Sequence, residues 1–312
     1  MKTAFNRRTI LLATALAAST TLLQACGGGD DEPQRNIVEV AQNTPELSIL
    51  VEAVVAAGLA PALSTGSLTV FAPTNAAFAA LLTELGVTKE ALLADKPLLN
   101  AVLKYHVLGS RVARADVPLG KAITPLSGGF FKIENAGGLK VTDGRNRVTK
   151  ITDTDIQASN GVIHLVDHVL LPANKDIVAT AAALPDFSIL VEAVVAAGLV
   201  STLQGAGPFT VFAPTNAAFA ALLTELGVTK DALLANKTLL TQVLTYHVVP
   251  ARVLKAEVPV NTAITTVQGQ TFTITSSLVI TDQNMRTSNI TAADVFTSNG
   301  VIHVVDKVIL PK

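Results

Sequence analysis

Serine, histidine and aspartate residues supply the side chains of a hydrolytic triad in this 312-residue chain. Ser159, His106, His164 and Asp167 are the candidates for nucleophile, base and orienting acid. Such catalysis needs a serine held on a sharp turn, and the chain has no Gly-x-Ser-x-Gly sequence that would build one. Ser159 instead precedes an Asn-Gly turn, which favours a structural role. We therefore expect no catalytic residue and no enzymatic activity.

A second possible chemistry is metal binding by His164 and His168, which lie four residues apart. Their segment reads as a β-strand, so both side chains would point to one face about 13 Å apart, at ~3.3 Å per residue. That distance is too great for one metal ion to bind both rings. Phosphate loops and dinucleotide fingerprints are absent from the sequence. We expect neither a metal ion nor a cofactor.

The N-terminus reads as an export signal. Lys2, Arg7 and Arg8 form a positive start, and an apolar run over residues 10–23 follows. The run is shorter than the ~20 residues of a comfortable membrane span, as is typical of a signal peptide. We predict a signal peptide over residues 1–25 and leave open whether the Sec or the twin-arginine route is used.

The only cysteine, Cys26, comes directly after this signal. The ending Leu23-Gln24-Ala25-Cys26 resembles the bacterial lipobox, where the signal is cut before the cysteine and the thiol is diacylated. We therefore predict a lipidated Cys26, a Gly-rich tether over residues 26–35 and attachment to a bacterial membrane, on the periplasmic side or at the cell surface. The alternative is an ordinary secretory signal with an incidental cysteine.

Long segments of the sequence occur twice. Residues 69–89 recur unchanged as residues 210–230, and residues 48–59 recur as residues 188–199. A period of about 140 residues is far above the 20–50 of stacked solenoid repeats, so each copy is a complete domain. We predict domains over residues 36–172 and 176–312. The short segment between them predicts a restricted relative orientation.

Each copy reads as a helical half followed by a sheet half. Thr74, Thr215 and Asp176 are expected to cap helices, because their side-chain oxygens can accept from the first free backbone amides. Beyond residues 106 and 247, alternating β-branched runs between Gly, Asn and Asp predict strands. The helices are expected over 36–42, 88–94, 96–105 and 176–183, and the strands over 68–71, 131–133, 140–142, 161–170, 209–212, 272–275, 278–281 and 300–310.

Composition excludes several classes of protein. Lys and Arg total 23 against 24 Asp and Glu, a balance that argues against a nucleic-acid binder. Aromatic residues are 4% with no Trp, which is thin for a platform that stacks bases or sugars. Hydrophobic residues reach 49%, but beyond the signal no segment approaches ~18 uninterrupted apolar residues.

Three motifs in a fixed order carry a family resemblance. TVFAPTNAAF is followed by LKYHV or LTYHV and then by SNGVIHLVD or SNGVIHVVD, once in each copy. This arrangement resembles the fasciclin-like domain, in two tandem copies over residues 36–312. The resemblance implies an α+β fold in which a wedge of β-strands has helices packed on one face. It also implies adhesion, because animal members bind integrins and matrix proteins, and bacterial members are secreted or surface proteins linked to attachment.

The resemblance also singles out the Tyr-His pairs. Tyr105-His106 and Tyr246-His247 contain both tyrosines of the chain, and the segment around this pair contributes to integrin binding in animal members. These four residues are our candidate interaction residues. The alternative is structural, with the hydroxyl and the imidazole tying a helix end to the sheet.

We expect the partner to be a cell-surface or matrix protein or a polysaccharide, together with the membrane through the lipid anchor, and no nucleic acid. The sequence leaves the oligomeric state open. A periplasmic or surface binding module for a small ligand or polysaccharide is the alternative function.

The two sheet halves differ in charge. Residues 109–158 contain eight Lys and Arg and five acidic residues, whereas residues 250–297 contain three of each. One interpretation is neutral drift on solvated loops. The other is that the first domain presents a mildly basic face to an anionic partner, such as lipid headgroups or an acidic polysaccharide.

Overall fold

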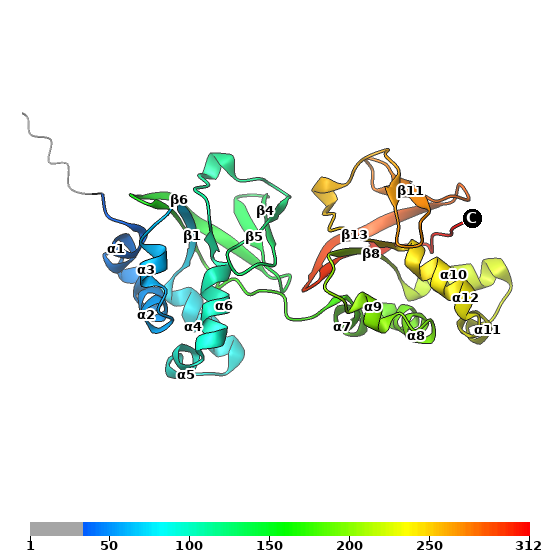
Figure 1. Ribbon diagram of the computed structural model, residues 1–312, viewed down its shortest axis with the longest axis horizontal. Helices are drawn as coiled ribbons and strands as arrows, with labels where there is room; N and C mark the ends of the chain where they lie inside the picture. The colour runs from blue at the N-terminus through cyan, green and yellow to red at the C-terminus, as the bar shows by residue number, and fades with distance from the viewer. Residues whose placement is uncertain (1–33) are drawn as a thin grey trace, which may run out of the picture. The chain divides into compact units, whose positions relative to one another are not determined.

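Six helices form the first half of the first repeat (Figure 1). They begin where the sequence supplies a cap: Asn36 accepts from the amides of Val38 and Glu39, and Thr74 accepts from that of Ala77. The fourth helix ends at Gly86, whose φ of 65° is the left-handed conformation that glycine adopts without strain. The helices are α1 (Ile37–Gln42), α2 (Ser48–Ala56), α3 (Ala60–Leu63), α4 (Asn75–Leu85), α5 (Lys89–Ala94) and α6 (Lys96–Tyr105).

This structure is a computed structural model that describes residues 34–312. The signal peptide and Cys26 therefore lie outside the described residues, as does most of the tether. From Arg35 to Lys312 the chain forms one unit that contains both repeats. Within this described part, no helix is both long and apolar enough to cross a membrane.

A seven-stranded sheet forms the second half of the first repeat, in the order β2-β1-β7-β6-β5-β4-β3. Strands β1 and β7 pair in parallel, and every other neighbouring pair is antiparallel. The strands are β1 (Leu68–Pro73), β2 (Val107–Leu108), β3 (Ala122–Ile123), β4 (Phe131–Asn135), β5 (Leu139–Thr142), β6 (Val148–Ala158) and β7 (Gly161–Val166).

Two apolar cores lie on opposite faces of β1. Val70 and Ala72 point to the helices and join Leu50, while Phe71 joins a second core with Phe131 inside the curled sheet. Both faces of β1 and β7 are buried, so these strands are mostly apolar, with Thr69 and His164 as their buried polar residues. The curled seven-stranded sheet with helices on one face confirms the α+β fold that the sequence predicted.

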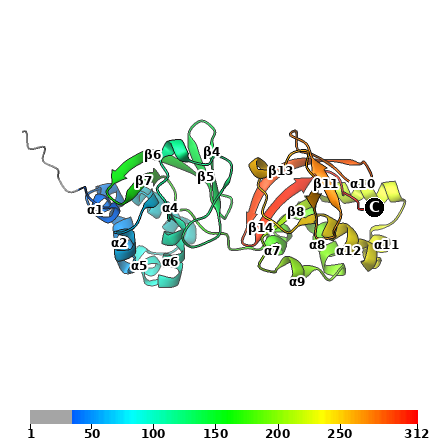
Figure 2. The same cartoon turned by 45° about the horizontal axis from the view of Figure 1, so that its top comes forward.

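The second repeat has the same organisation (Figure 2). Thr215 and Asp176 cap their helices as predicted. Its helices are α7 (Ile177–Ala182), α8 (Ser188–Ala196), α9 (Val200–Leu203), α10 (Asn216–Leu226), α11 (Lys230–Ala235) and α12 (Lys237–Tyr246). Its strands are β8 (Phe209–Pro214), β9 (Val248–Val249), β10 (Ile264–Thr265), β11 (Thr271–Ile274), β12 (Val279–Thr281), β13 (Thr287–Thr297) and β14 (Gly300–Val305).

The last strand of each repeat is shorter than predicted. Strand β7 ends at Val166, although residues 169–171, beyond Asp167 and His168, are again apolar. The amide of Leu170 donates to the Nε2 atom of His106 (2.8 Å), and that of Leu171 donates to the carboxylate of Asp143 (3.0 Å). These side chains take the place of strand partners, so the chain leaves the sheet while its apolar residues stay buried.

Candidate functional site

The Tyr-His pairs lie where α6 and α12 run into the sheets. The side chains of Tyr105 and Tyr246 have 0% exposure. The Tyr105 hydroxyl donates to the carbonyl of Phe130, and that of Tyr246 donates to the carbonyl of Thr271 at 2.8 Å. Burial raises the pKa of Tyr105 above its usual value and that of Tyr246 to about 12, so both hydroxyls remain donors at neutral pH.

The histidine of each pair joins a helix to the segment that follows the last strand. His106 Nδ1 lies 2.7 Å from the carbonyl of Val102, which makes Nδ1 the protonated donor. Its Nε2 accepts from the amide of Leu170. His247 repeats both bonds, with Val243 and Ile309. All four candidate interaction residues thus have structural partners inside the fold, and their contact with an external partner stays a prediction.

Burial shapes the acid–base behaviour of these histidines. It lowers the pKa of His106 and of His247 to about 4, because a charged ring would lose its hydration. A proton on Nε2 would also face the amide hydrogen that this atom now accepts. Burial lowers the pKa of His303 as well.

A pH-dependent loss of stability follows. Above pH 6.5, His106 and His247 are neutral in both the folded and the unfolded chain. Between pH 6.5 and pH 4, these two histidines take up protons only in the unfolded chain. The free energy of unfolding should fall over this window as the pH drops, by up to about 1.4 kcal/mol per pH unit for each histidine. Urea unfolding at pH 7.5, 6 and 5 measures the slope. A flat profile would contradict the assignment, and the exposed His168→Asn provides the control variant.

The residues of the possible triad do not assemble. His164 Nε2 lies 3.0 Å from the carbonyl of Val112, and its Nδ1 accepts from the amide of Asp155. Asp167 accepts from the amide of Lys150. Over residues 34–312, no hydrogen bond links the Ser159 hydroxyl to an imidazole. In the same range, no group of three or more His, Cys, Asp or Glu side chains is placed to hold a metal ion.

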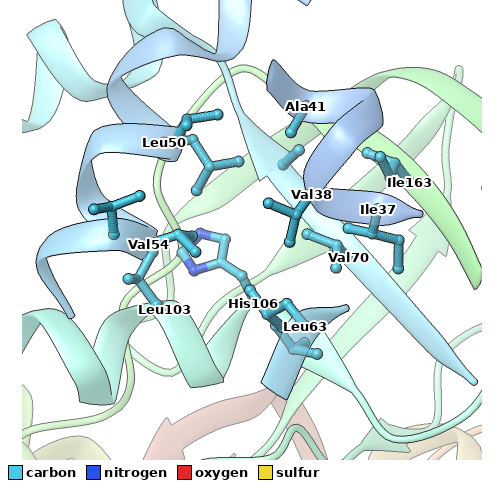
Figure 3. A pocket seen from close by; sticks show the side chains of 14 residues that line it. Ile37, Val38, Ala41, Leu50, Val54, Leu63, Val70, Leu103, His106 and Ile163 are labelled. Atoms are coloured by element: carbon cyan, nitrogen blue, oxygen red, sulfur yellow. The ribbon is translucent and has the colours of Figure 1, made fainter. Parts of the chain in front are cut away.

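An apolar pocket opens beside His106 in the first repeat (Figure 3). Figure 3 shows the imidazole close to Val54 and Leu103, with Val38 and Leu50 nearby. The free space inside measures about 30 Å³, which admits one or two water molecules but no organic ligand. The second repeat has an equivalent pocket of the same volume beside His247. Neither pocket makes a small-molecule site as it stands.

A junction between the two repeats is built around a buried ion pair. The Lys132 ammonium on β4 lies 2.8 Å from Asp294 on β13 and 3.0 Å from Glu134. The side chains of Lys132 and Asp294 are only 10% and 3% exposed. A second oxygen of Asp294 accepts from the amide of Lys255 at 2.7 Å. The pair is therefore both desolvated and held by further hydrogen bonds.

Aromatic and amide contacts surround that ion pair. The rings of Phe130 and Phe296 lie 4.7 Å apart between centroids, and the Arg252 guanidinium lies 4.5 Å from the centroid of Phe130. Asn146 accepts from the amide of Phe296 at 2.6 Å and donates to its carbonyl at 3.0 Å. We define the junction as these six residues: Phe130, Lys132, Asn146, Arg252, Asp294 and Phe296.

Four of the six junction residues are not shared by the two copies, whereas Arg252 and Asp294 have Arg111 and Asp155 as their counterparts. Where the first repeat has Phe130, Lys132 and Asn146, the second has Thr271, Thr273 and Met285. Where the second repeat has Phe296, the first has Gln157. Sequence reasoning missed this site. The signal that was available is a paired difference. Only the first copy has an aromatic ring directly before β4 (Phe130) and a cation on β4 (Lys132), and only the second has the matching ring on its long strand β13 (Phe296).

Two similar α+β domains joined through a junction define a tandem-domain protein. The Fasciclin domain model matches residues 45–172 and 185–311, and the chain belongs to this family. Both matches start after the first helix of their repeat, although Ile37 and Ile177 on those helices are buried in the cores.

Relatives are found in animals and bacteria. The chain is 31% identical to the pig transforming growth factor-beta-induced protein ig-h3 over 253 residues, which cover 79% of this chain and 35% of the pig protein. It is 46% identical to protein sll1483 of Synechocystis over 138 residues, 43% of this chain and 73% of that protein. Human periostin is 27% identical over 292 residues, covering 89% and 31% of the two chains.

Among solved structures, a FAS1 domain pair from the insect cell adhesion molecule fasciclin I matches with a TM-score of 0.42 and 18% identity. The match covers 85% of this chain and 97% of that one. The chain spans about a third of the length of the pig and human relatives.

Proposed function

We propose that this chain is an exported, non-enzymatic adhesion protein that binds a cell-surface or matrix partner through the outer surface of its paired domains. One observation carries the proposal. The imidazoles of His106, His164, His247 and His303 and both tyrosine hydroxyls are bound to backbone groups inside the fold. These six side chains therefore hold the fold together, and we assign recognition of a partner to the outer surface. Membership of the fasciclin family supports the same role.

Retention of cells on a coated surface tests adhesion. A soluble chain of residues 35–312 is immobilised, and intact cells or matrix fragments are passed over it under flow. We expect more retention than on a surface coated with an unrelated protein at equal density, and competition by the same chain in solution. Retention equal to that of the unrelated protein would reject the adhesive role. Turnover of ester or peptide substrates that survives purification to homogeneity would reject the non-enzymatic one.

We propose further that Cys26 is the lipid anchor, on the basis of the Leu-x-Ala-Cys ending. Cys26→Ser is expected to abolish labelling with radioactive palmitate and to move the protein out of the membrane fraction or leave it uncleaved. The thiol is the only one in the chain, so no other cysteine can take its place. Unchanged labelling together with unchanged fractionation would refute the anchor.

A binding module for a polysaccharide or small ligand is the second candidate. It is favoured by a polar cleft of about 720 Å³ beside the junction, since ligand sites usually enclose 300–1,000 Å³ and often lie where domains meet. Saturable binding of a defined sugar to the soluble chain, without retention of cells, would favour this function over adhesion.

A further inference from the structure

The polar cleft beside the junction is made by segments of both repeats. Its walls are the turn between β5 and β6, the linker at Asn174 and Lys175, helix α7, and residues 293–296 of β13. Its volume of about 720 Å³ is more than twenty times that of either apolar pocket beside His106 and His247. The cleft is therefore large enough for a small organic ligand.

The charge of the cleft is positive. Four cationic side chains line it against two acidic ones, Glu84 and Asp294. Lys132 is neutralised by Asp294, and Arg147 forms ion pairs with Asp143 and Glu84. The other two cations are Arg145 and Lys175. In the described part of the chain, neither has an acidic group within ion-pair distance.

Arg145 also carries an unused donor. Its Nε atom is buried and has no hydrogen-bond partner among residues 34–312. A buried donor without a partner is costly and rare in folded proteins, so the fold leaves the hydrogen-bonding capacity of the Arg145 side chain partly unused. The Asp143 carboxylate accepts from the amides of Arg145 (2.9 Å) and Arg147 (3.0 Å), which holds the turn in place before any ligand arrives.

The second repeat does not reproduce this site. The same turn is held there by Asp282, but Asn284 stands in the place of Arg145 and donates to the carbonyls of Leu310 and Pro311. The Arg145 cation and its unpartnered Nε are thus specific to the first repeat. Arg145 opposite Asn284 also accounts for one charge of the difference between the two sheet halves.

We propose that this cleft binds the carboxylate of an acidic sugar, with Arg145 and Lys175 as the anion-binding residues. A guanidinium matches a carboxylate with two parallel hydrogen bonds, and a lysine adds a point charge. Asn174, Thr180 and Leu184 also line the cleft. The side-chain amide of Asn174 and the hydroxyl of Thr180 are groups that can bind sugar hydroxyls, and Leu184 offers an apolar contact to the ring. The inference rests on the proposed interaction function and gives it a partner chemistry: a glycan that carries uronic acid.

Titration calorimetry of the soluble chain of residues 35–312 tests the site. The probes are a glucuronate-containing disaccharide, the matching neutral glucose disaccharide and inorganic sulfate. We expect saturable binding of the acidic disaccharide that weakens with salt, and at least about tenfold weaker binding by Arg145→Gln and by Lys175→Gln. Lys150→Gln is the matched control, because it removes a cation from the same sheet half outside the cleft and should bind as the parent does.

Several results would overturn the assignment. Equal losses of affinity in Lys150→Gln and Arg145→Gln would mean a diffuse charge effect. Equal affinity for the neutral disaccharide would mean that the carboxylate does not contribute to recognition. Sulfate binding as tight as that of the disaccharide would reject a sugar ligand. Cell retention by Arg145→Gln at the parent's level, together with absent disaccharide binding by the parent, would reject the cleft and leave adhesion standing. Disaccharide binding without cell retention would do the reverse.

Discussion

Phe71→Ala is expected to lower the free energy of unfolding of the first repeat by about 3–5 kcal/mol. Phe71 is 1% exposed and packs edge-to-face on Phe131, with 5.3 Å between the ring centroids. It also lies 5.5 Å from the ring of His164. Removal of the ring leaves a cavity in the core between β1 and β4. Urea unfolding of residues 35–312 measures the loss.

The second repeat supplies a matched comparison. Phe212 occupies the same position, 1% exposed and 5.1 Å from Phe272, so Phe212→Ala should cost a similar amount in its own domain. Val148→Ala, at a side chain that is 58% exposed, should change stability by less than about 0.5 kcal/mol. A loss below about 1 kcal/mol for Phe71→Ala would mean that this ring does not form the core of the curled sheet.

Lys132→Met is expected to destabilise the paired domains by about 3–5 kcal/mol, because it leaves the Asp294 carboxylate buried without its cation. The double variant Lys132→Met with Asp294→Asn should recover most of the loss, since the neutral amide oxygen can still accept from the amide of Lys255. Differential scanning calorimetry should also show the two domains melting more independently in the single variant than in the parent.

A surface ion pair provides the control for this prediction. Lys230 and Glu192 lie 2.7 Å apart but are 40% and 46% exposed, so Lys230→Met should cost at most about 1 kcal/mol. If Lys132→Met costs no more than Lys230→Met, the junction does not stabilise the pair.

Local structure was predictable from the sequence because its causes are local. Thr74, Thr215 and Asp176 cap their helices as expected, since a side-chain oxygen needs only the next turn of backbone. The ends of β7 and β14 were not predictable in the same way. They depend on His106 and His247, which lie about 60 residues earlier in the chain and take the amides that would have extended the strands.

The junction and the cleft were not predictable from the sequence alone. Lys132 and Asp294 are 162 residues apart, and nothing in the sequence around either residue indicates the other. The count of basic residues did indicate that the first sheet half is unusual. Only the fold separates the cations that are neutralised, such as Lys132, from Arg145, whose Nε has no partner among the described residues.

The junction joins unlike surfaces, since β4 of one repeat meets β13 of the other. Contacts of this head-to-tail kind can be repeated from molecule to molecule and then generate open filaments. The two counterpart surfaces in this chain differ from the junction in the residues that form it. One carries Gln157 where the junction needs Phe296, and the other carries Thr273 where it needs Lys132. The junction therefore cannot be repeated with the same residues from one molecule to the next.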